Sequence, residues 1–287
     1  MFLKRMLKGN KYTYSLIKII RKIQLTIIPY YLYISKFNVA KLLRLIGFNK
    51  NSPYEKLKQI KNKHIGQRCF IIATGPSLKI EDLEKLRNEI TFGVNSICLA
   101  FEQTDWRPTY YGIQDEWVYS KLEKPIDKIK VEGRFLSNTM LRKVKINLTD
   151  KDYIFPMNML NHHLKHKKYR TKFSENAFAV VYNGYSVTYS VLQLAVYMGF
   201  KEIYLLGADC NYLSDKKQHF KEYADVESDP TLGDMMISGF KEAKKYADRK
   251  NIKIYNATRG GKLEVFERVN LDTVISNYNT KSKRLLS

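Results

Sequence analysis

The stretch SVTYSVLQLAVYMGFKEIYLLGAD, residues 186–209, contains a helix that leads directly into a strand. Apolar residues recur at helical spacing in its first half, and Gly199 is placed to end the helix. The EIYLLG run then predicts a buried strand that finishes just before Asp209. The helical stripe consists of Val187, Val191, Leu194, Ala195 and Met198.

The same alternation of strand and helix extends outward on both sides, from about residue 65 onward. Residues 80–90 and 233–251 show helical patterns, the latter with an apolar stripe. This alternation predicts an α/β, Rossmann-like fold with a mostly parallel sheet flanked by helices. The predicted strands are 69–73, 90–94, 109–113, 133–137, 202–207 and 252–256, and the second stripe is Met236, Phe240, Ala243 and Ala247.

Two segments lack clean periodicity. Residues 138–178 contain a basic patch around His162 to Lys172, and we interpret them as an inserted lid or acceptor-facing surface. Residues 211–234 are polar, contain Pro and Gly, and are predicted to form a loop. We predict a basic amphipathic arm at 1–60 and an α/β nucleotide-sugar-binding catalytic domain at 61–287.

The charge of the chain is concentrated near its beginning. The net charge is +22, and residues 1–50 carry eleven Lys and Arg but no Asp or Glu. No zinc-ligand spacing, basic zipper or RNA-binding aromatic motif supports a nucleic-acid partner. Lys and Arg interleaved with Ile, Leu and Tyr are instead typical of a segment at an anionic membrane surface.

The basic arm has an alternative interpretation, as a helix packed on its own domain or on the partner of a homo-oligomer. Its longest apolar run has twelve residues and contains Pro29, too short to span a bilayer. No secretory signal is evident. Cys69, Cys98 and Cys210 show no paired spacing and are expected to be buried thiols in a reducing compartment. These features predict a cytoplasmic protein held peripherally at the inner face of the cell membrane.

Polar residues follow the predicted strands and precede the helix at 187. In open parallel sheets ligands bind beyond the carboxyl ends of the strands, so these residues should form one crevice. Small and hydroxyl-bearing side chains there, together with the free amides of a helix start, suit a phosphorylated ligand. The candidate binding residues are Thr74, Gly75, Pro76, Ser77, Asn95, Ser96, Gln114, Asp115, Gly184, Ser186 and Asp209.

Other kinds of site are disfavoured by the sequence. Neither a Walker-type phosphate loop nor a G-x-G-x-x-G turn is present. His162, His163 and His166 lie in a Lys-rich stretch without a nearby carboxylate or Cys, a poor metal site. His219 follows the strand that ends near Asp209, and its usual pKa near 6.5 would let it accept a proton from a hydroxyl at neutral pH.

Ordered motifs in the chain resemble the MptE-like family, named for an archaeal 6-hydroxymethylpterin diphosphokinase. The resemblance covers about 65–275. The chain is also similar to the bacterial sialyltransferases of glycosyltransferase family 42, through the GPSL turn and the strand before Asp209. The motifs are ATGPSL (73–78), GVNS (93–96), YYGIQDEW (110–117), the run 183–212, QHF (218–220) and NATRGGKLEVF (256–266).

The resemblance implies roles for several of these residues. Gly75, Pro76, Ser77 and Asn95 would lie near the nucleotide, and Ser186 near a phosphate or sugar carboxylate. His219 would act as general base and Tyr212 would hydrogen-bond the leaving phosphate, without a metal or other cofactor. Two departures are that NGYS (183–186) lacks the sialyltransferase arginine, and that Asp115 places an acid where a sugar would lie.

Three functions are consistent with these features. The first is a metal-independent glycosyltransferase that moves a sugar by single displacement from a nucleotide-sugar donor, CMP-activated and acidic, to a glycan or lipid-linked acceptor. The second is a Mg²⁺-dependent 6-hydroxymethylpterin diphosphokinase, with Asp115 and Asp209 binding the metal of ATP. The third is a non-enzymatic nucleotide- or polyanion-binding module of surface polysaccharide assembly.

Overall fold

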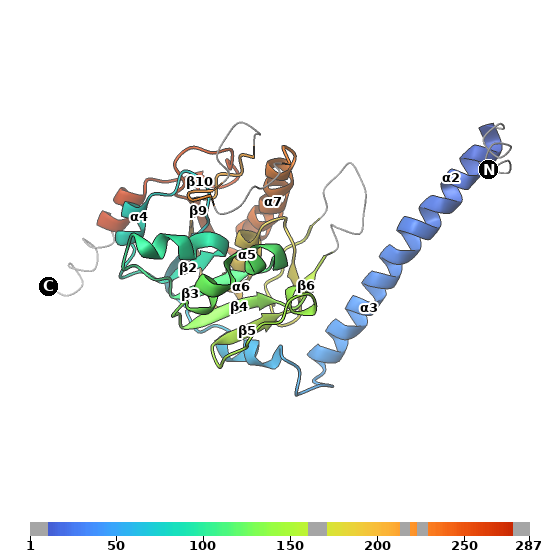
Figure 1. Cartoon of the computed structure of the whole chain (residues 1–287), viewed down its shortest axis with the longest axis horizontal. Coiled ribbons are helices and arrows are strands. Elements are labelled where there is room, and N and C mark those ends of the chain that lie inside the picture. Colours follow the sequence, from blue (N-terminus) through green and yellow to red (C-terminus); the bar gives the residue numbers. More distant parts are fainter. Residues whose placement is uncertain (1–10, 160–170, 213–218, 223–228, 278–287) are drawn as a thin grey trace.

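The fold is built on one large parallel sheet, seen in Figure 1. The computed structural model describes residues 11–159, 171–212, 219–222 and 229–277. Eight strands lie in the order β10-β9-β8-β1-β2-β3-β4-β5, and every neighbouring pair is parallel. The strands are β1 (Arg68–Ile72), β2 (Thr91–Val94), β3 (Tyr110–Ile113), β4 (Gly133–Ser137), β5 (Asp152–Phe155), β8 (Glu202–Leu206), β9 (Lys253–Asn256) and β10 (Glu267–Arg268).

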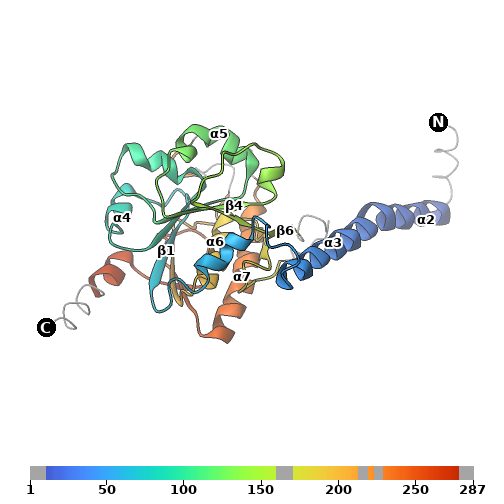
Figure 2. The ribbon, with the colours of Figure 1, turned by 90° about the horizontal axis from the view of Figure 1, so that it is seen from below.

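Helices cover both faces of this sheet, as Figure 2 shows. A second, two-stranded parallel sheet pairs β6 (Met157–Asn158) with β7 (Val181–Tyr182). The predicted α/β, Rossmann-like architecture is therefore confirmed. The helical segments of the α/β body are η2 (Glu55–Ile60), α4 (Ile80–Glu84), η3 (Asn95–Glu102), α5 (Glu116–Asp127), η4 (Met140–Arg142), α6 (Val187–Tyr197) and α7 (Leu232–Lys250).

Alternating side chains of the strands feed two separate cores. In β1, Cys69 and Ile71 pack in the core that contains α6 and α7, whereas Phe70 and Ile72 pack in the core that contains α5. Successive side chains of a strand point to opposite faces, so a strand buried on both faces must be apolar throughout. This explains why the predicted strands appear as continuous apolar runs rather than as alternating patterns.

The two long predicted helices are confirmed, with one refinement. In α7 the predicted stripe is buried and the opposite face is exposed. In α6, however, almost every residue is buried, including Thr188, Ser190 and Gln193. The polar side chains of α6 are accommodated by hydrogen bonds, because Gln193 bonds the backbone of Tyr182 and Ser190 bonds Gln114.

Two expectations about secondary structure need correction. The helix expected at 80–90 is limited to α4 and is followed by turns. The segment expected to be an irregular insertion at 138–178 contains β5, which extends the main sheet beside β4, and also β6. Short strands of this kind are difficult to recognise, because β5 begins with Asp152, a residue that is rare in strands. The histidine cluster at 162–166 lies outside the described residues.

The basic N-terminal helical arm is confirmed as a helix. Segments α2 (Lys11–Lys22), η1 (Ile23–Ile27) and α3 (Ile28–Leu45) form one long helix, which projects from the α/β body in both views (Figures 1 and 2). We call this the arm helix. No helix in the described part of the chain has both the length and the apolarity to cross a membrane. The division at residue 60 stays a prediction, although Leu57 and Ile60 already belong to the core of the body.

Candidate active site

A pocket lies where the strand order reverses. The chain proceeds from β1 outward to β5, and β8 later returns to the other side of β1. Ligands of open parallel sheets bind at such a switch point, beyond the carboxyl ends of the strands. The cavity volume of the pocket is about 50 Å³. This is below the roughly 300–1,000 Å³ of small-molecule sites, so the cavity itself encloses only part of such a ligand.

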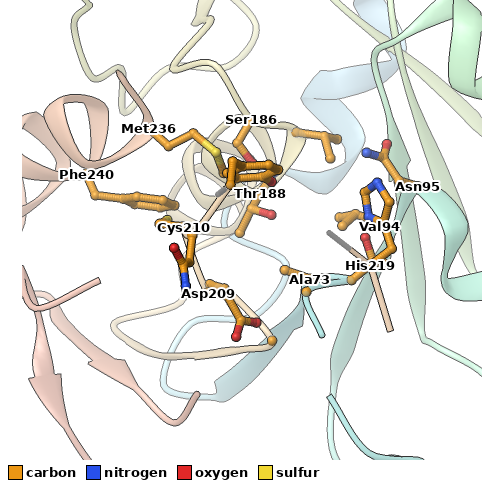
Figure 3. A pocket seen from close by; sticks show the side chains of 17 residues that line it. Ala73, Val94, Asn95, Ser186, Thr188, Asp209, Cys210, His219, Met236 and Phe240 are labelled. Atoms are coloured by element: carbon orange, nitrogen blue, oxygen red, sulfur yellow. The ribbon is translucent and has the colours of Figure 1, made fainter. Parts of the chain in front are cut away.

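Most of the polar residues predicted for the crevice do meet in this pocket, and Figure 3 shows several of them. They come from the ends of β1, β2 and β8, from the start of α6, and from the loop that carries His219. The predicted residues that line the pocket are Thr74, Gly75, Asn95, Ser186, Asp209, Tyr212 and His219.

Two further predicted residues, Pro76 and Ser77, lie in the turn beside the pocket. Ser77 donates hydrogen bonds from its hydroxyl and its backbone N–H to Oδ2 of Asp209, at 2.8 and 3.4 Å. Burial raises the pKa of the Asp209 carboxyl, and the hydrogen bonds from Ser77 oppose this shift. Ser77 therefore binds the carboxylate of Asp209 rather than a ligand. Pro76 is exposed.

The remaining predicted residues lie outside the pocket lining, and two of them, Asp115 and Gln114, have structural partners there. Asp115 caps α5, because its Oδ1 accepts from the N–H groups of Trp117 and Val118 at 2.8 and 3.1 Å. The Oε1 atom of Gln114 accepts from Ser190 at 2.7 Å. Ser96 and Gly184 are buried, and a Cβ at Gly184 would meet the ring of Tyr189 at 2.2 Å.

The close approach at Gly75 serves the protein rather than a ligand. A Cβ at Gly75 would lie 2.0 Å from Oδ2 of Asp209 and 2.5 Å from the carbonyl oxygen of Gly207. The N–H of Gly75 also donates to that carbonyl at 2.9 Å. A phosphate at the start of α4 would need this space, but α4 has only five residues, and the space is taken by Asp209.

We predict that Gly75→Ala lowers the free energy of unfolding by about 1–3 kcal/mol, the usual cost of forcing a group into a packed site. The clash with the Gly207 carbonyl involves backbone, so rotation of the Asp209 side chain cannot relieve it. Urea denaturation measures this loss. The control is Gly260→Asn, since Gly260 (φ +67) has nothing within 4 Å of a built Cβ and Asn tolerates this left-handed conformation. Equal losses in both variants would contradict the packing argument.

Two amide oxygens in the pocket are buried without a protein partner among the described residues. They are Oδ1 of Asn95 and Oδ1 of Asn211, and both residues line the pocket. The hydroxyl of Tyr111 donates to the backbone carbonyl of Asn95 at 2.7 Å, and the side chain of Asn95 lines the pocket (Figure 3). A buried acceptor without a donor costs free energy. Both oxygens are therefore suited to accept hydrogen bonds from a ligand.

Backbone strain is concentrated around the same pocket. Asn95 (φ 44) and Cys210 (φ 50) line the pocket, and Tyr185 (φ 66) directly precedes Ser186. Left-handed backbone at residues other than Gly costs on the order of 1–3 kcal/mol and tends to be found at functional sites. Strain at three positions around one cavity supports the assignment of this cavity as the functional site.

The start of α6 forms one wall of the pocket. Ser186, Val187 and Thr188 line it, and the Ser186 hydroxyl caps the helix by accepting from the Thr188 N–H at 3.2 Å. The positive end of a helix dipole favours a negatively charged group. The expected cap is confirmed, and the helix places partial positive charge at the pocket.

His219 is held in a form that can accept a proton. Burial lowers the pKa of its imidazole below the usual value, while Glu222 and a hydrogen bond to the backbone of Thr74 act in the opposite direction. The neutral ring therefore predominates at neutral pH. The neighbouring Phe220 N–H donates to the Thr74 carbonyl at 3.0 Å, which fixes this loop on the end of β1.

The stretch 256–266 forms hydrogen bonds with the backbone of Ala208 and Asp209. Thr258 accepts from the N–H of Ala208 at 3.0 Å, and the N–H of Lys262 donates to the carbonyl of Asp209 at 2.7 Å. Arg259 forms an ion pair with the buried Asp82 of α4. These residues position the pocket without lining it.

Sequence reasoning missed part of the lining. Asn211 follows Asp209 at the carboxyl end of β8, so the rule that located Asp209 could have located it too. Met236 and Phe240 of α7 form the apolar wall opposite Asn95 and His219 in the view of Figure 3. Their helical spacing is that of ordinary core residues, and no local signal in the sequence distinguishes a residue that lines the pocket from one that only packs in the core. Among the described residues, no group of three or more His, Cys, Asp or Glu is arranged to hold a metal ion.

Comparisons with known proteins identify the family. The family model described as "6-hydroxymethylpterin diphosphokinase MptE-like" matches residues 40–215. A solved structure of the MAf glycosyltransferase from Magnetospirillum magneticum AMB-1 is similar at a TM-score of 0.48 and 10% identity, covering 81% of this chain and 41% of that chain. This chain therefore spans less than half of that protein's length. No curated protein matches. Because the family model matches more than half of the chain, the protein belongs to the MptE-like family.

Proposed function

We propose that this protein is a glycosyltransferase that transfers a CMP-activated acidic sugar to a glycan or lipid-linked acceptor by single displacement, without a metal. In this proposal it acts in the cytoplasm, at the inner face of the cell membrane, in surface polysaccharide assembly. The main support is the set of groups that meet at the switch point: a neutral histidine, a helix start, and two unpartnered amide oxygens.

The unpartnered oxygens favour a ligand with hydrogen-bond donors. A cytosine amino group or a sugar hydroxyl could donate to Asn95 or Asn211, which would relieve the cost of these buried acceptors. Asn95 lies at the end of β2, beside the β1 turn where the resemblance expects the nucleotide. Met236 and Phe240 add an apolar wall, as is usual in pockets for small molecules.

His219 would act as the general base. Its neutral imidazole takes the proton of the acceptor hydroxyl while the hydroxyl oxygen forms a bond to the anomeric carbon of the donor sugar. The bond from that carbon to the CMP phosphate breaks in the same step, and CMP leaves with the electron pair. The proton remains on His219 until it passes to solvent.

Charge on the departing phosphate would be met by dipoles. No Lys or Arg lines the part of the pocket that the structure describes. In this proposal the positive end of the α6 dipole and the hydroxyl of Tyr212, a residue that lines the pocket, stabilise the leaving CMP. This arrangement agrees with the lack of an arginine in NGYS (183–186).

The diphosphokinase alternative is less well supported by the positions of its two carboxylates. It requires Asp115 and Asp209 to bind the Mg²⁺ of ATP. Asp115 is engaged as the cap of α5, outside the pocket lining, and Asp209 accepts hydrogen bonds from Ser77. Each carboxylate thus already has a role within the fold.

A thermal-shift screen tests the proposal directly. We expect CMP to raise the melting temperature equally with and without Mg²⁺, because the pocket offers neutral and dipolar groups for it. A ligand at 100 times its Kd adds about 2.7 kcal/mol to the stability. UDP, GDP and ATP, each with and without Mg²⁺, are the comparison ligands, and Asn95→Ala together with Asn211→Ala should remove the response to CMP.

Other results would exclude the proposal. A response to ATP that requires Mg²⁺, with none to CMP, would favour the diphosphokinase. A response to CMP without sugar transfer or slow hydrolysis of a CMP-sugar would favour a binding module.

A further inference from the structure

The arm helix exposes an unusual amount of apolar surface. Sixteen of the nineteen large apolar side chains that are exposed among the described residues lie between Tyr12 and Phe48. Tyr12 is 86% exposed, and Leu16 and Ile19 are more than half exposed. Contiguous apolar surface of this kind marks an interaction site.

Five exposed apolar residues of α2 and the start of η1 form one stripe, and Tyr14 lies outside it. Each member of the stripe lies three or four residues from another member, which places them on one face of a helix: Tyr12, Leu16, Ile19, Ile20 and Ile23. The basic residues Lys11, Lys18 and Lys22 recur at the same intervals on the other side. The segment α2 is therefore strongly amphipathic.

The stripe continues into α3, shifted by one residue. Exposed apolar residues recur there at Ile28, Tyr31, Leu32, Val39 and Leu42. Continued at α-helical spacing from Ile23, the stripe would instead fall on Ile27, Tyr30, Ile34 and Phe37. Of these four residues only Ile27 is exposed, at 38%, and the other three are half-buried.

The π-helical segment η1 supplies the shift. The N–H of Ile28 bonds the carbonyl of Ile23, five residues back, which adds one residue to the turn. Pro29 follows immediately. Pro lacks an N–H, and its ring crowds the carbonyl four residues earlier, here that of Leu25 within η1. Pro29 thus gives a physical cause for the wider turn.

The opposite side of α3 faces the α/β body. The N–H of Met159 donates to the hydroxyl of Tyr33 at 2.7 Å, and Arg44 donates to the carbonyls of Phe178 and Ala179 at 3.2 and 2.7 Å. Tyr33 and Arg44 are eleven residues apart, which places them on one face. The described residues of the body therefore hold α3 by one face and do not cover its apolar face.

We propose that the arm helix lies flat on an anionic lipid bilayer, with this continuous apolar face inserted at the boundary of headgroups and acyl chains. Residues 1–50 carry eleven cations and no acid, which complements anionic headgroups. A second copy of the chain would instead bring like charges together, which is unfavourable at an interface. Bilayer binding is independent of the chemistry in the pocket.

Vesicle co-sedimentation of the full chain tests this inference. We expect binding to vesicles of phosphatidylcholine mixed with phosphatidylglycerol, weaker binding to phosphatidylcholine alone, and a decrease with added salt. The variant Leu16→Gln with Ile19→Gln should bind the vesicles at least about tenfold more weakly. Burial of a single Leu or Ile side chain already strengthens binding by about tenfold or more. Gln keeps a high helix propensity, so the arm should still be helical.

The matched control makes the same kind of substitution at two exposed apolar residues of the α/β body. Leu148 and Ile65 are 53% and 69% exposed, so Leu148→Gln with Ile65→Gln removes comparable apolar surface away from the arm and should leave vesicle binding unchanged. Equal binding by both double variants would overturn the inference. Sedimentation velocity tests the alternative of a dimer. If the wild type is a dimer and the arm variant is a monomer that still binds vesicles, the apolar face of the arm helix contacts a second copy of the chain. Vesicle binding without any response to CMP would leave this inference intact and exclude the proposed function alone.

Discussion

Replacement of His219 by Ala should lower kcat for sugar transfer by about 10² to 10⁴, the usual contribution of a general base. His219 lines the pocket, and burial keeps its imidazole neutral at physiological pH. Release of CMP from a CMP-sugar in the presence of acceptor measures the rate. The thermal response to CMP should persist in the variant, since the unpartnered Asn oxygens remain. A loss of less than about tenfold would exclude the role of His219 as base.

The pH dependence of the wild-type rate provides an independent readout. The active form of His219 is neutral, so kcat should fall as the pH decreases through the pKa of this residue. Because burial lowers that pKa, the midpoint should lie below about 6.5, the usual value for histidine. In His219→Ala the residual kcat should no longer fall as the pH decreases. If kcat still falls at low pH in that variant, another group controls the titration.

Replacement of Arg134 by Ala should lower the free energy of unfolding by about 3–5 kcal/mol, because it leaves a buried carboxylate without its partner. Arg134 of β4 donates from Nε and from a terminal nitrogen to the two oxygens of Asp152 in β5, at 2.5 and 2.9 Å. The two side chains are only 7% and 2% exposed. Arg134 also contacts Asp127 at the end of α5 at 3.0 Å. Urea denaturation with a comparison of m-values measures the loss.

Two controls separate the unpaired charge from lost packing. Lys244→Ala breaks the exposed pair with Asp248, whose side chains are 42% and 58% exposed, and should cost less than about 1 kcal/mol. Arg134→Met combined with Asp152→Leu removes both charges and should be less destabilising than Arg134→Ala. A double variant as unstable as the single one would show that packing, not charge, accounts for the loss.

The central strands could be predicted because they are buried on both faces. A run such as 202–207 has to be apolar at every position, and this signal is visible in the sequence. The edge of the sheet gives a weaker signal. β5 begins with Asp152, whose carboxylate accepts hydrogen bonds from Arg134 of the neighbouring strand and from Thr149. The pair with Arg134 is a long-range contact, so no local pattern reveals it.

The candidate site could be located in part by the rule of strand ends. Thr74, Asn95, Asp209 and Ser186 meet in one pocket as the rule expects. Asp115 also follows a strand, yet its carboxylate caps α5, because a short acidic side chain at a strand-to-helix junction serves equally as a cap. The same local chemistry fits both roles, and only the three-dimensional arrangement distinguishes them.

The pairing of β1 with β8 constrains when this pocket can form. Arg68 lies opposite Glu202, so the two strands that carry the pocket come from distant parts of the chain. Non-local pairing of parallel strands is slow, since loop closure must precede the contacts that reward it. During synthesis the turn at Gly75 leaves the ribosome long before the loop at Asp209. Ligand binding can therefore assist only the last stage of folding, after β8 has been made.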